Sequence, residues 1–163
     1  MKKLNKKGFT LIELLAVIVI LAIVAAVSMT VIVPMISGQS NKGAETSVKE
    51  LNKQVANACS AAGATEAYGN FEAAKYYTDN TKATETTVSD CAGSGCYIEL
   101  SGNDAATFVK GMNISGDMPA HIKMTVANCQ VQTSCVDYTA GQFSGLKVDT
   151  AANGSVEATD GTC

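Results

Sequence analysis

The sequence predicts an α+β protein, with a long N-terminal helix followed by a small antiparallel β-sheet domain. Three observations support this prediction: an apolar run over residues 9–33, an amphipathic stretch that continues to residue 62, and a remainder with another composition. From Ala64 onward, Thr, Gly, Ser, Asn and Asp are frequent, and short alternating segments are separated by Gly-containing turns. A helical region followed by a run of strands is typical of the α+β class.

The apolar run is long enough to be a membrane helix. Phe9–Val33 contains 25 residues, and a helix of that length crosses a hydrocarbon core of about 30 Å. An ordinary secretory signal has a shorter apolar core of about 7–15 residues. Four lysines precede the run and favour a cytoplasmic N-terminus, with everything after Val33 outside: Lys2, Lys3, Lys6 and Lys7. A plain signal anchor with one helix is the alternative.

Glu13 is the single ionisable side chain between Phe9 and Val33. An isolated carboxylate inside a membrane helix costs several kcal/mol, so such a residue marks a functional site with a partner. The alternative is that Glu13 extends its carboxylate to the interface beside the leader lysines, as charged residues near helix ends do.

The amphipathic stretch predicts that the helix continues to about Ala62. Lys49 lies four residues after Glu45, a spacing that favours an ion pair on the solvent face. Gly63 offers a helix end, because glycine adopts the left-handed cap conformation without penalty. Apolar residues recur at intervals of three and four and define one buried face: Ala44, Val48, Leu51, Val55, Cys59 and Ala62.

Three residues weaken the long helix near its middle. Pro34 removes one backbone hydrogen bond and crowds the preceding turn. Gly38 and Gly43 each lower helix stability by about 1 kcal/mol relative to alanine. We therefore expect a kink, or a segment that can lose its helix, within residues 30–43. Without further context this segment reads as a linker at the membrane exit.

The remaining residues predict a sheet of three to five strands. Strands are expected at 96–100, 121–129, 136–138, 145–149 and 155–158, and a helical turn at 105–110. Asn153-Gly154 between two strands is a hairpin signal. Residues 78–90 are polar and are predicted to be a loop. The aromatic segment with Phe71, Tyr76 and Tyr77 is predicted to be a helix or turn over the sheet.

All six cysteines follow the apolar run: Cys59, Cys91, Cys96, Cys129, Cys135 and Cys163. An even number on the exported side indicates disulfides, with fifteen ways to pair them. Short separations favour the bridges Cys129–Cys135 and Cys91–Cys96, which leaves Cys59–Cys163. Zinc is the alternative, but its ligand sets need short Cys-x-x-Cys spacings or interleaved histidines, and the one histidine, His121, is remote in sequence. We therefore expect no metal.

Composition argues against several classes of function. The chain has no arginine, and without the four leader lysines it has eight lysines against fifteen acidic residues, a balance of −7. Direct binding of nucleic acid is therefore not expected. No catalytic constellation is found, His121 is interpreted as an exposed or core-edge residue, and no cofactor is expected. Four residues near the C-terminus contain oxygen ligands for Ca²⁺, but their spacing does not match an EF-hand and solvation is favoured: Asp149, Asn153, Glu157 and Asp160.

The N-terminus resembles that of type IV prepilins. The similarity rests on the basic leader ending at Gly8 and on the sequence that follows, Phe9-Thr10-Leu11-Ile12-Glu13-Leu14-Leu15. It covers about residues 1–60, and beyond residue 63 it extends only to architecture. The resemblance implies cleavage after Gly8 by the prepilin peptidase and N-methylation at Phe9. The domains would be a leader (1–8), a transmembrane and filament-core helix (9–33), an amphipathic helix (34–62) and a disulfide-stapled head (63–163).

The resemblance also implies a partner for each stage of assembly. The precursor would wait in the cell membrane with its head outside, and an extrusion ATPase and a platform protein would drive it into a surface filament. That filament would contain copies of this chain and minor pilins, joined by their N-terminal helices. The amine created at Phe9 would pair with Glu13 of a neighbouring subunit, which reduces the cost of burying the carboxylate. The family's subunits also tolerate local loss of helix near Pro34.

Several functions of such a filament remain open from the sequence: adhesion, motility or DNA uptake. The alternatives are a pseudopilin of a type II secretion system and, less favoured, a single-pass membrane-anchored binding module. Six cysteines exceed the single C-terminal pair that is common in pilins, so the family's usual pairing is not carried over to this chain.

Overall fold

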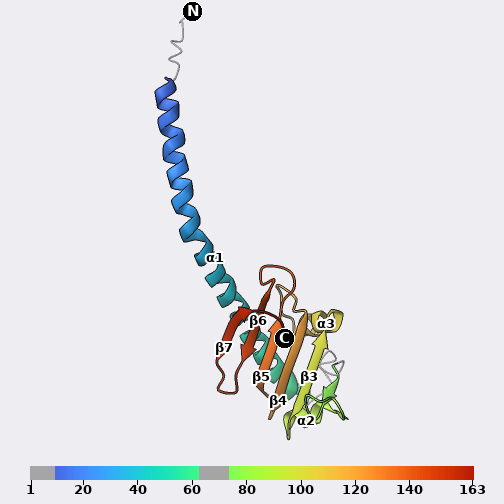
Figure 1. Ribbon diagram of the computed structural model, residues 1–163. Coiled ribbons are helices and arrows are strands. Elements are labelled where there is room, and N and C mark those ends of the chain that lie inside the picture. The colour runs from blue at the N-terminus through green and yellow to red at the C-terminus, as the bar shows by residue number, and fades with distance from the viewer. Residues whose placement is uncertain (1–9, 63–73) are drawn as a thin grey trace, which may run out of the picture. The chain divides into compact units, whose positions relative to one another are not determined.

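The computed structural model describes residues 10–62 and 74–163, without the side chains of residues 27–37, Ala62 and Val88. Its chain forms two compact units, residues 1–38 and 39–163. Helix α1 (Leu11–Ala62) begins in the first unit and continues without interruption into the second, which confirms the predicted long helix. Figure 1 shows the elements in chain order.

The unit from Gln39 onward contains one antiparallel sheet of seven strands. Its spatial order is β2-β1-β3-β4-β5-β6-β7, so most neighbours in the sheet are also neighbours in the chain. The strands are β1 (Tyr76–Tyr77), β2 (Glu85–Thr86), β3 (Cys96–Ser101), β4 (His121–Ala127), β5 (Gln130–Asp137), β6 (Leu146–Thr150) and β7 (Val156–Asp160). The helices α2 (Val88–Ala92) and α3 (Asn103–Gly111) flank β3 in the chain.

The described sheet is larger than the three to five strands predicted. Strands β1 and β2 have two residues each, too few to show an alternating pattern, and they form because Tyr76 pairs with Ile98 and Thr86. The expected loop over residues 78–90 thus contains β2 and the start of α2, and Tyr76–Tyr77 is a strand rather than a helix or turn. Phe71 lies outside the described residues.

The longer strands agree with the sequence pattern except at their ends. β4 ends at Ala127 because Asn128 and Cys129 make a two-residue turn, with φ of 52° and 54°. β5 begins at Gln130, well before the predicted start at residue 136. The sequence did not indicate this earlier start, because the first half of the strand is largely exposed and shows no apolar alternation.

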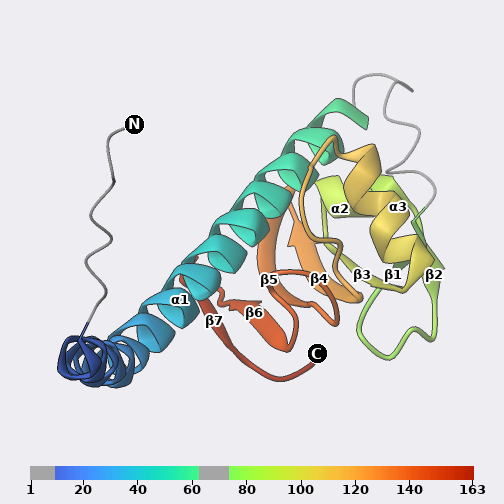
Figure 2. The same ribbon diagram turned by 90° about the horizontal axis from the view of Figure 1, so that it is seen from above.

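The core lies between one face of the sheet and the helices. Five residues of the predicted stripe of α1 are buried there, at 0–3% exposure: Ala44, Val48, Leu51, Val55 and Cys59. The sixth, Ala62, has a side chain outside the described residues. Figure 2 shows residues 39–62 of α1 lying across the sheet, with α3 beyond them. Ile122, Met124 and Val126 of β4 meet this layer, and the residues that alternate with them face the open side.

One surface ion pair expected on α1 is not formed. The carboxylate of Glu45 accepts a hydrogen bond from the backbone N–H of Ala158 (3.4 Å) instead of pairing with Lys49. Ala158 lies on β7, an edge strand whose outward backbone groups have no strand partner. Tertiary structure therefore redirects Glu45 to the edge of the sheet.

Candidate functional site

Glu13 lies in the first turn of α1 and caps it. One carboxylate oxygen, Oε2, accepts hydrogen bonds from the backbone N–H and the hydroxyl of Thr10, both at 2.8 Å. The N–H of Glu13 donates in return to Oγ1 of Thr10 (3.4 Å). This reciprocal pattern is a capping box, and it orients the carboxylate toward the N-terminal end of the helix.

The role of Thr10 was not predicted, although the Thr-x-x-Glu spacing before an apolar run is its sequence signal. Both donors from Thr10 use the same carboxylate oxygen of Glu13. Within the described part of the chain, no hydrogen bond reaches the other oxygen, Oε1, and no cation lies within 4 Å of the carboxylate. Glu13 is therefore oriented and still has acceptor capacity. Gly8 and Phe9 lie outside the described residues.

The helix beyond Glu13 exposes apolar side chains around its whole circumference. Eleven large apolar residues are 48–82% exposed: Leu11, Ile12, Leu14, Leu15, Val17, Ile18, Val19, Ile20, Leu21, Ile23 and Val24. A helix that is apolar on every side is stable in lipid or among other helices. Of the residues whose side chains are described, no helical stretch meets the length and hydropathy required of a membrane span.

Pro34, Gly38 and Gly43 do not interrupt the helix, because α1 is helical through all three. The expected loss of helix within residues 30–43 is thus not seen in α1, and the expected kink stays a prediction. The two glycines have different surroundings. A Cβ at Gly38 would meet no atom within 4 Å, whereas a Cβ at Gly43 would lie 3.0 Å from Cε1 of Phe143. Gly43 thus serves as a packing site for an aromatic ring.

The disulfides are Cys59–Cys129, Cys91–Cys96 and Cys135–Cys163. The bridge Cys91–Cys96 agrees with the prediction from the sequence. The predicted pairs Cys129–Cys135 and Cys59–Cys163 are wrong. Cys135 lies in the interior of β5 opposite Lys123, so it does not face the turn that carries Cys129. That turn instead meets the C-terminal part of α1 at Cys59, and Cys163 reaches Cys135 across the open face of the sheet.

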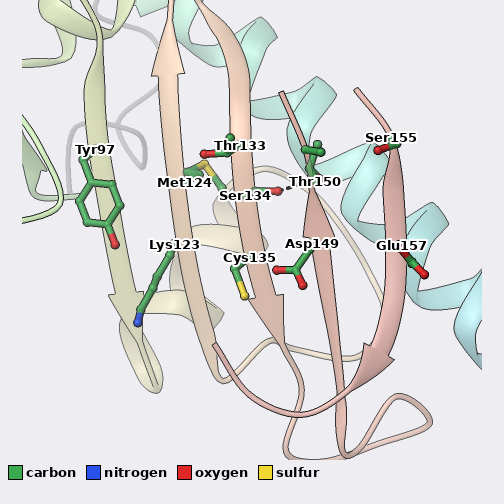
Figure 3. Close-up of a pocket in the computed structure, with 11 residues that line it drawn as sticks. Tyr97, Lys123, Met124, Thr133, Ser134, Cys135, Asp149, Thr150, Ser155 and Glu157 are labelled. Carbon is green, nitrogen blue, oxygen red and sulfur yellow. Dashed lines mark hydrogen bonds between the residues drawn. The ribbon is translucent and has the colours of Figure 1, made fainter. Parts of the chain in front are cut away.

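The open face of the sheet carries a groove of about 330 Å³. Its centre is a row of four residues in register across four strands: Lys123, Cys135, Asp149 and Glu157. Figure 3 shows these side chains with Tyr97 at one side of the row. Most of their polar groups are already engaged. The Lys123 ammonium donates to the backbone oxygen of Cys163 (3.0 Å), and Asp149 pairs with Lys147 (2.9 Å).

The predicted oxygen ligands for Ca²⁺ do not converge. Asn153 uses its side-chain oxygen to accept hydrogen bonds from the N–H and hydroxyl of Ser155 (3.0 and 2.8 Å). Asp149 faces Glu157 across β6 and β7, whereas Asp160 lies opposite Leu146. Over residues 10–62 and 74–163, no three His, Cys, Asp or Glu side chains form a group that could hold a metal ion.

His121 is half-exposed and binds a buried carboxylate. Its Nδ1 lies 2.9 Å from Oδ1 of Asp137, and Ser101 is its neighbour on β3 in the strand register. No hydrogen bond joins Ser101 and His121 among those found in the described chain. The second oxygen of Asp137 accepts the N–H of Cys163 (2.8 Å). The His–Asp pair therefore holds the C-terminal segment and lacks the arrangement of an activated nucleophile.

Comparison with known proteins bears on the N-terminus alone. No curated protein and no solved structure shows a significant match to this chain. A family model described as the prokaryotic N-terminal methylation motif matches residues 3–29. That stretch contains three of the four leader lysines, the Gly8-Phe9 junction, the capping box and the exposed apolar residues Leu11 to Val24. The motif supports a type IV pilin-like or pseudopilin protein in general, and such a leader belongs to precursors processed for export and membrane assembly. The N-terminus of this chain therefore carries the prokaryotic N-terminal methylation motif, which is consistent with a leader of the type IV prepilin type.

Proposed function

We propose that this chain is a structural subunit of a type IV filament rather than an enzyme. In this proposal it is cleaved after Gly8, N-methylated at Phe9 and polymerised through its N-terminal helix. The observation that carries the proposal is the position of Glu13. It is the one ionisable residue of the apolar run over residues 9–33, it is oriented by Thr10, and it lies within the matched motif.

Assembly needs a favourable exchange of environments for the helix. Lipid tails and neighbouring apolar helices are equally apolar, so transfer from the bilayer to a helix bundle changes the hydrophobic free energy little. The choice of one arrangement of neighbouring helices over another must then come from side-chain packing and from polar groups. Glu13 provides such a group, because Oε2 is bound by Thr10 while Oε1 accepts no hydrogen bond from the described residues.

The partner of Glu13 in this proposal is the methylated amine of Phe9 on a neighbouring subunit. Opposite charges that meet in an apolar bundle offset much of the cost of burying each one. Because each helix carries one carboxylate and one amine near its start, a single axial offset between subunits brings the two together. The ion pair would therefore set the register of the filament.

The proposal assigns a location to each stage. The precursor is anchored in the cell membrane with its sheet domain outside, and the prepilin peptidase acts at its cytoplasmic end. A platform protein and an extrusion ATPase then transfer the subunit to a surface filament, together with minor pilins. Support comes from the leader motif and from the disulfide-rich domain, since disulfides persist in oxidising compartments.

The test is a comparison of Glu13→Ala and Glu13→Gln with wild type in cells that contain the assembly machinery. Both variants should insert, be cleaved before Phe9 and fold their outer domain, yet give at least about tenfold fewer filaments, the factor expected from losing about 1.4 kcal/mol per contact. Glu50→Gln, on the exposed part of the same helix, is the matched control and should assemble normally.

Filament counts at the wild-type level in both Glu13 variants would reject the ion-pair mechanism. N-terminal sequencing of the membrane-bound chain tests the rest of the proposal independently. A subunit should begin at methylated Phe9, and a chain that begins at Met1 would instead indicate a membrane-anchored binding module.

A further inference from the structure

The β5–β6 loop, residues 139–145, holds α1 at two points. We call this loop the clasp. The hydroxyl of Ser40 donates a hydrogen bond to the backbone oxygen of Gln142 (2.9 Å). One turn later, the ring of Phe143 packs against the bare backbone of Gly43, where an added Cβ would lie 3.0 Å from Cε1. Among the residues of α1 whose side chains are described, Ser40 is the first that makes a hydrogen bond or ring contact with the clasp.

The clasp is itself fastened to the rest of the sheet domain. The N–H of Phe143 donates to Oδ2 of Asp117 (2.9 Å), and the Phe143 ring meets Tyr138 edge to face, with ring centroids 5.3 Å apart. The N–H of Gly145 closes the loop on the carbonyl of Tyr138 (2.8 Å). Tyr138 is only 4% exposed and Phe143 packs against the core cluster, so the Phe143 ring anchors the otherwise exposed clasp to the core.

Gly38, two residues before Ser40, lacks a packing neighbour like the Phe143 ring at Gly43 in the described part of the chain. Among the described residues, a Cβ at Gly38 would find no atom within 4 Å, and the compact unit that contains the sheet begins at Gln39. Pro34 lacks the N–H that would bind the carbonyl four residues earlier. Residues 34–39 thus combine a missing hydrogen bond, an unsupported glycine and the end of the compact domain.

We propose that the clasp sets the limit of local helix opening in α1. Residues 34–39 open and close independently of the sheet domain, whereas residues from Ser40 onward open only when the clasp releases. This deepens the proposed function, on which its biological use rests. A subunit that passes from a membrane to a filament must change the surroundings of its N-terminal helix, and a joint that ends at Ser40 allows this without disturbing the core.

Amide hydrogen exchange on the cleaved full-length subunit in detergent micelles tests the proposal. Peptides covering residues 35–39 should exchange at least about tenfold faster than those covering residues 44–55, with a step at the clasp, because sub-global opening needs less free energy than release of a packed element. Equal protection on both sides of Ser40 would overturn the proposal.

Two glycine substitutions should have opposite effects. Gly38→Ala meets no neighbour, so its better helix propensity should slow exchange in residues 35–39 by about fivefold. Gly43→Ala has the same gain in propensity but pushes the Phe143 ring away, so exchange in residues 40–43 should become faster. Slower exchange in both variants would show that propensity alone governs this segment and would reject the clasp.

Phe143→Ala provides a test that leaves the helix sequence unchanged. It should bring the exchange of residues 40–43 to the level of residues 35–39, while β3 and β4 remain protected as in wild type. No change at residues 40–43 would also reject the clasp. All these measurements use the monomeric subunit, so their outcome does not depend on whether the chain forms filaments.

Discussion

The carboxylate of Asp137 is 1% exposed and lies 2.9 Å from Nδ1 of His121, which is 47% exposed. Its second oxygen accepts the backbone N–H of Cys163 (2.8 Å), and Lys123 donates to the backbone oxygen of the same cysteine (3.0 Å). A polar latch thus reinforces the disulfide Cys135–Cys163 and keeps the C-terminal segment on the open face of the sheet.

Removal of the Asp137 carboxylate should destabilise this latch. Asp137→Ala leaves His121 and the N–H of Cys163 without their acceptor, so we expect the free energy of unfolding to fall by about 2–4 kcal/mol. Urea denaturation of the cleaved subunit measures the change. Asp160→Ala, on the exposed end of β7, is the control and should stay within about 0.5 kcal/mol of wild type. Equal losses in both variants would contradict the latch.

The three disulfides should stabilise the protein in the order of the loops that they close. Replacing both cysteines by serine should cost about 4 kcal/mol for Cys59–Cys129, about 3.5 for Cys135–Cys163 and about 2 for Cys91–Cys96. The physical reason is that the separations are 70, 28 and 5 residues, and longer loops lose more entropy in the unfolded chain. Denaturation midpoints test the order, and non-reducing mass mapping tests the pairing itself. Recovery of a Cys129–Cys135 peptide would contradict this account.

Tyr138 should make stability fall in alkaline solution. Burial, with the nearby charge of Asp117, raises the pKa of its phenol from 10.0 to about 12. The unfolded chain therefore loses this proton first, so the contribution is complete below about pH 10 and is lost as pH rises toward 12. Tyr138→Phe should show a shallower loss of unfolding free energy between about pH 10 and 12. Parallel curves for the variant and wild type would exclude Tyr138 as the source.

Processing should depend on the absence of a side chain at Gly8. In the proposed processing, the peptidase accepts the residue before the cut in a narrow site beside the membrane, so Gly8→Val should leave an uncleaved, membrane-retained precursor. Gel mobility and N-terminal sequencing of the membrane fraction report the result. Normal cleavage and filament assembly by this variant would refute the prediction.

Local signals in the sequence were sufficient to predict the elements whose structure depends on residues close to one another in the chain. The apolar stripe from Ala44 to Cys59 predicted the buried face of α1, because helical periodicity alone decides which side chains share a face. The alternation in β4 predicted its inward residues in the same way, and the short separation of Cys91 and Cys96 agrees with their bridge. The N-terminal methylation motif was likewise recognisable from the order of residues along the chain.

Only the tertiary structure decided which distant residues meet. Cys59 and Cys129 are paired because the β4–β5 turn reaches the end of α1, and no spacing in the chain reports that distance. Glu45 binds β7 instead of Lys49 because an edge strand offers an unpaired N–H that outcompetes a solvated ion pair. Gly43 is read from sequence as a weak point of the helix, yet the Phe143 ring, one hundred residues later, makes it a point of attachment. The sequence by itself determined the leader, the helix and the periodic faces, which depend on local interactions, whereas the cross-links and contacts that join α1 to the sheet depend on the three-dimensional path of the chain.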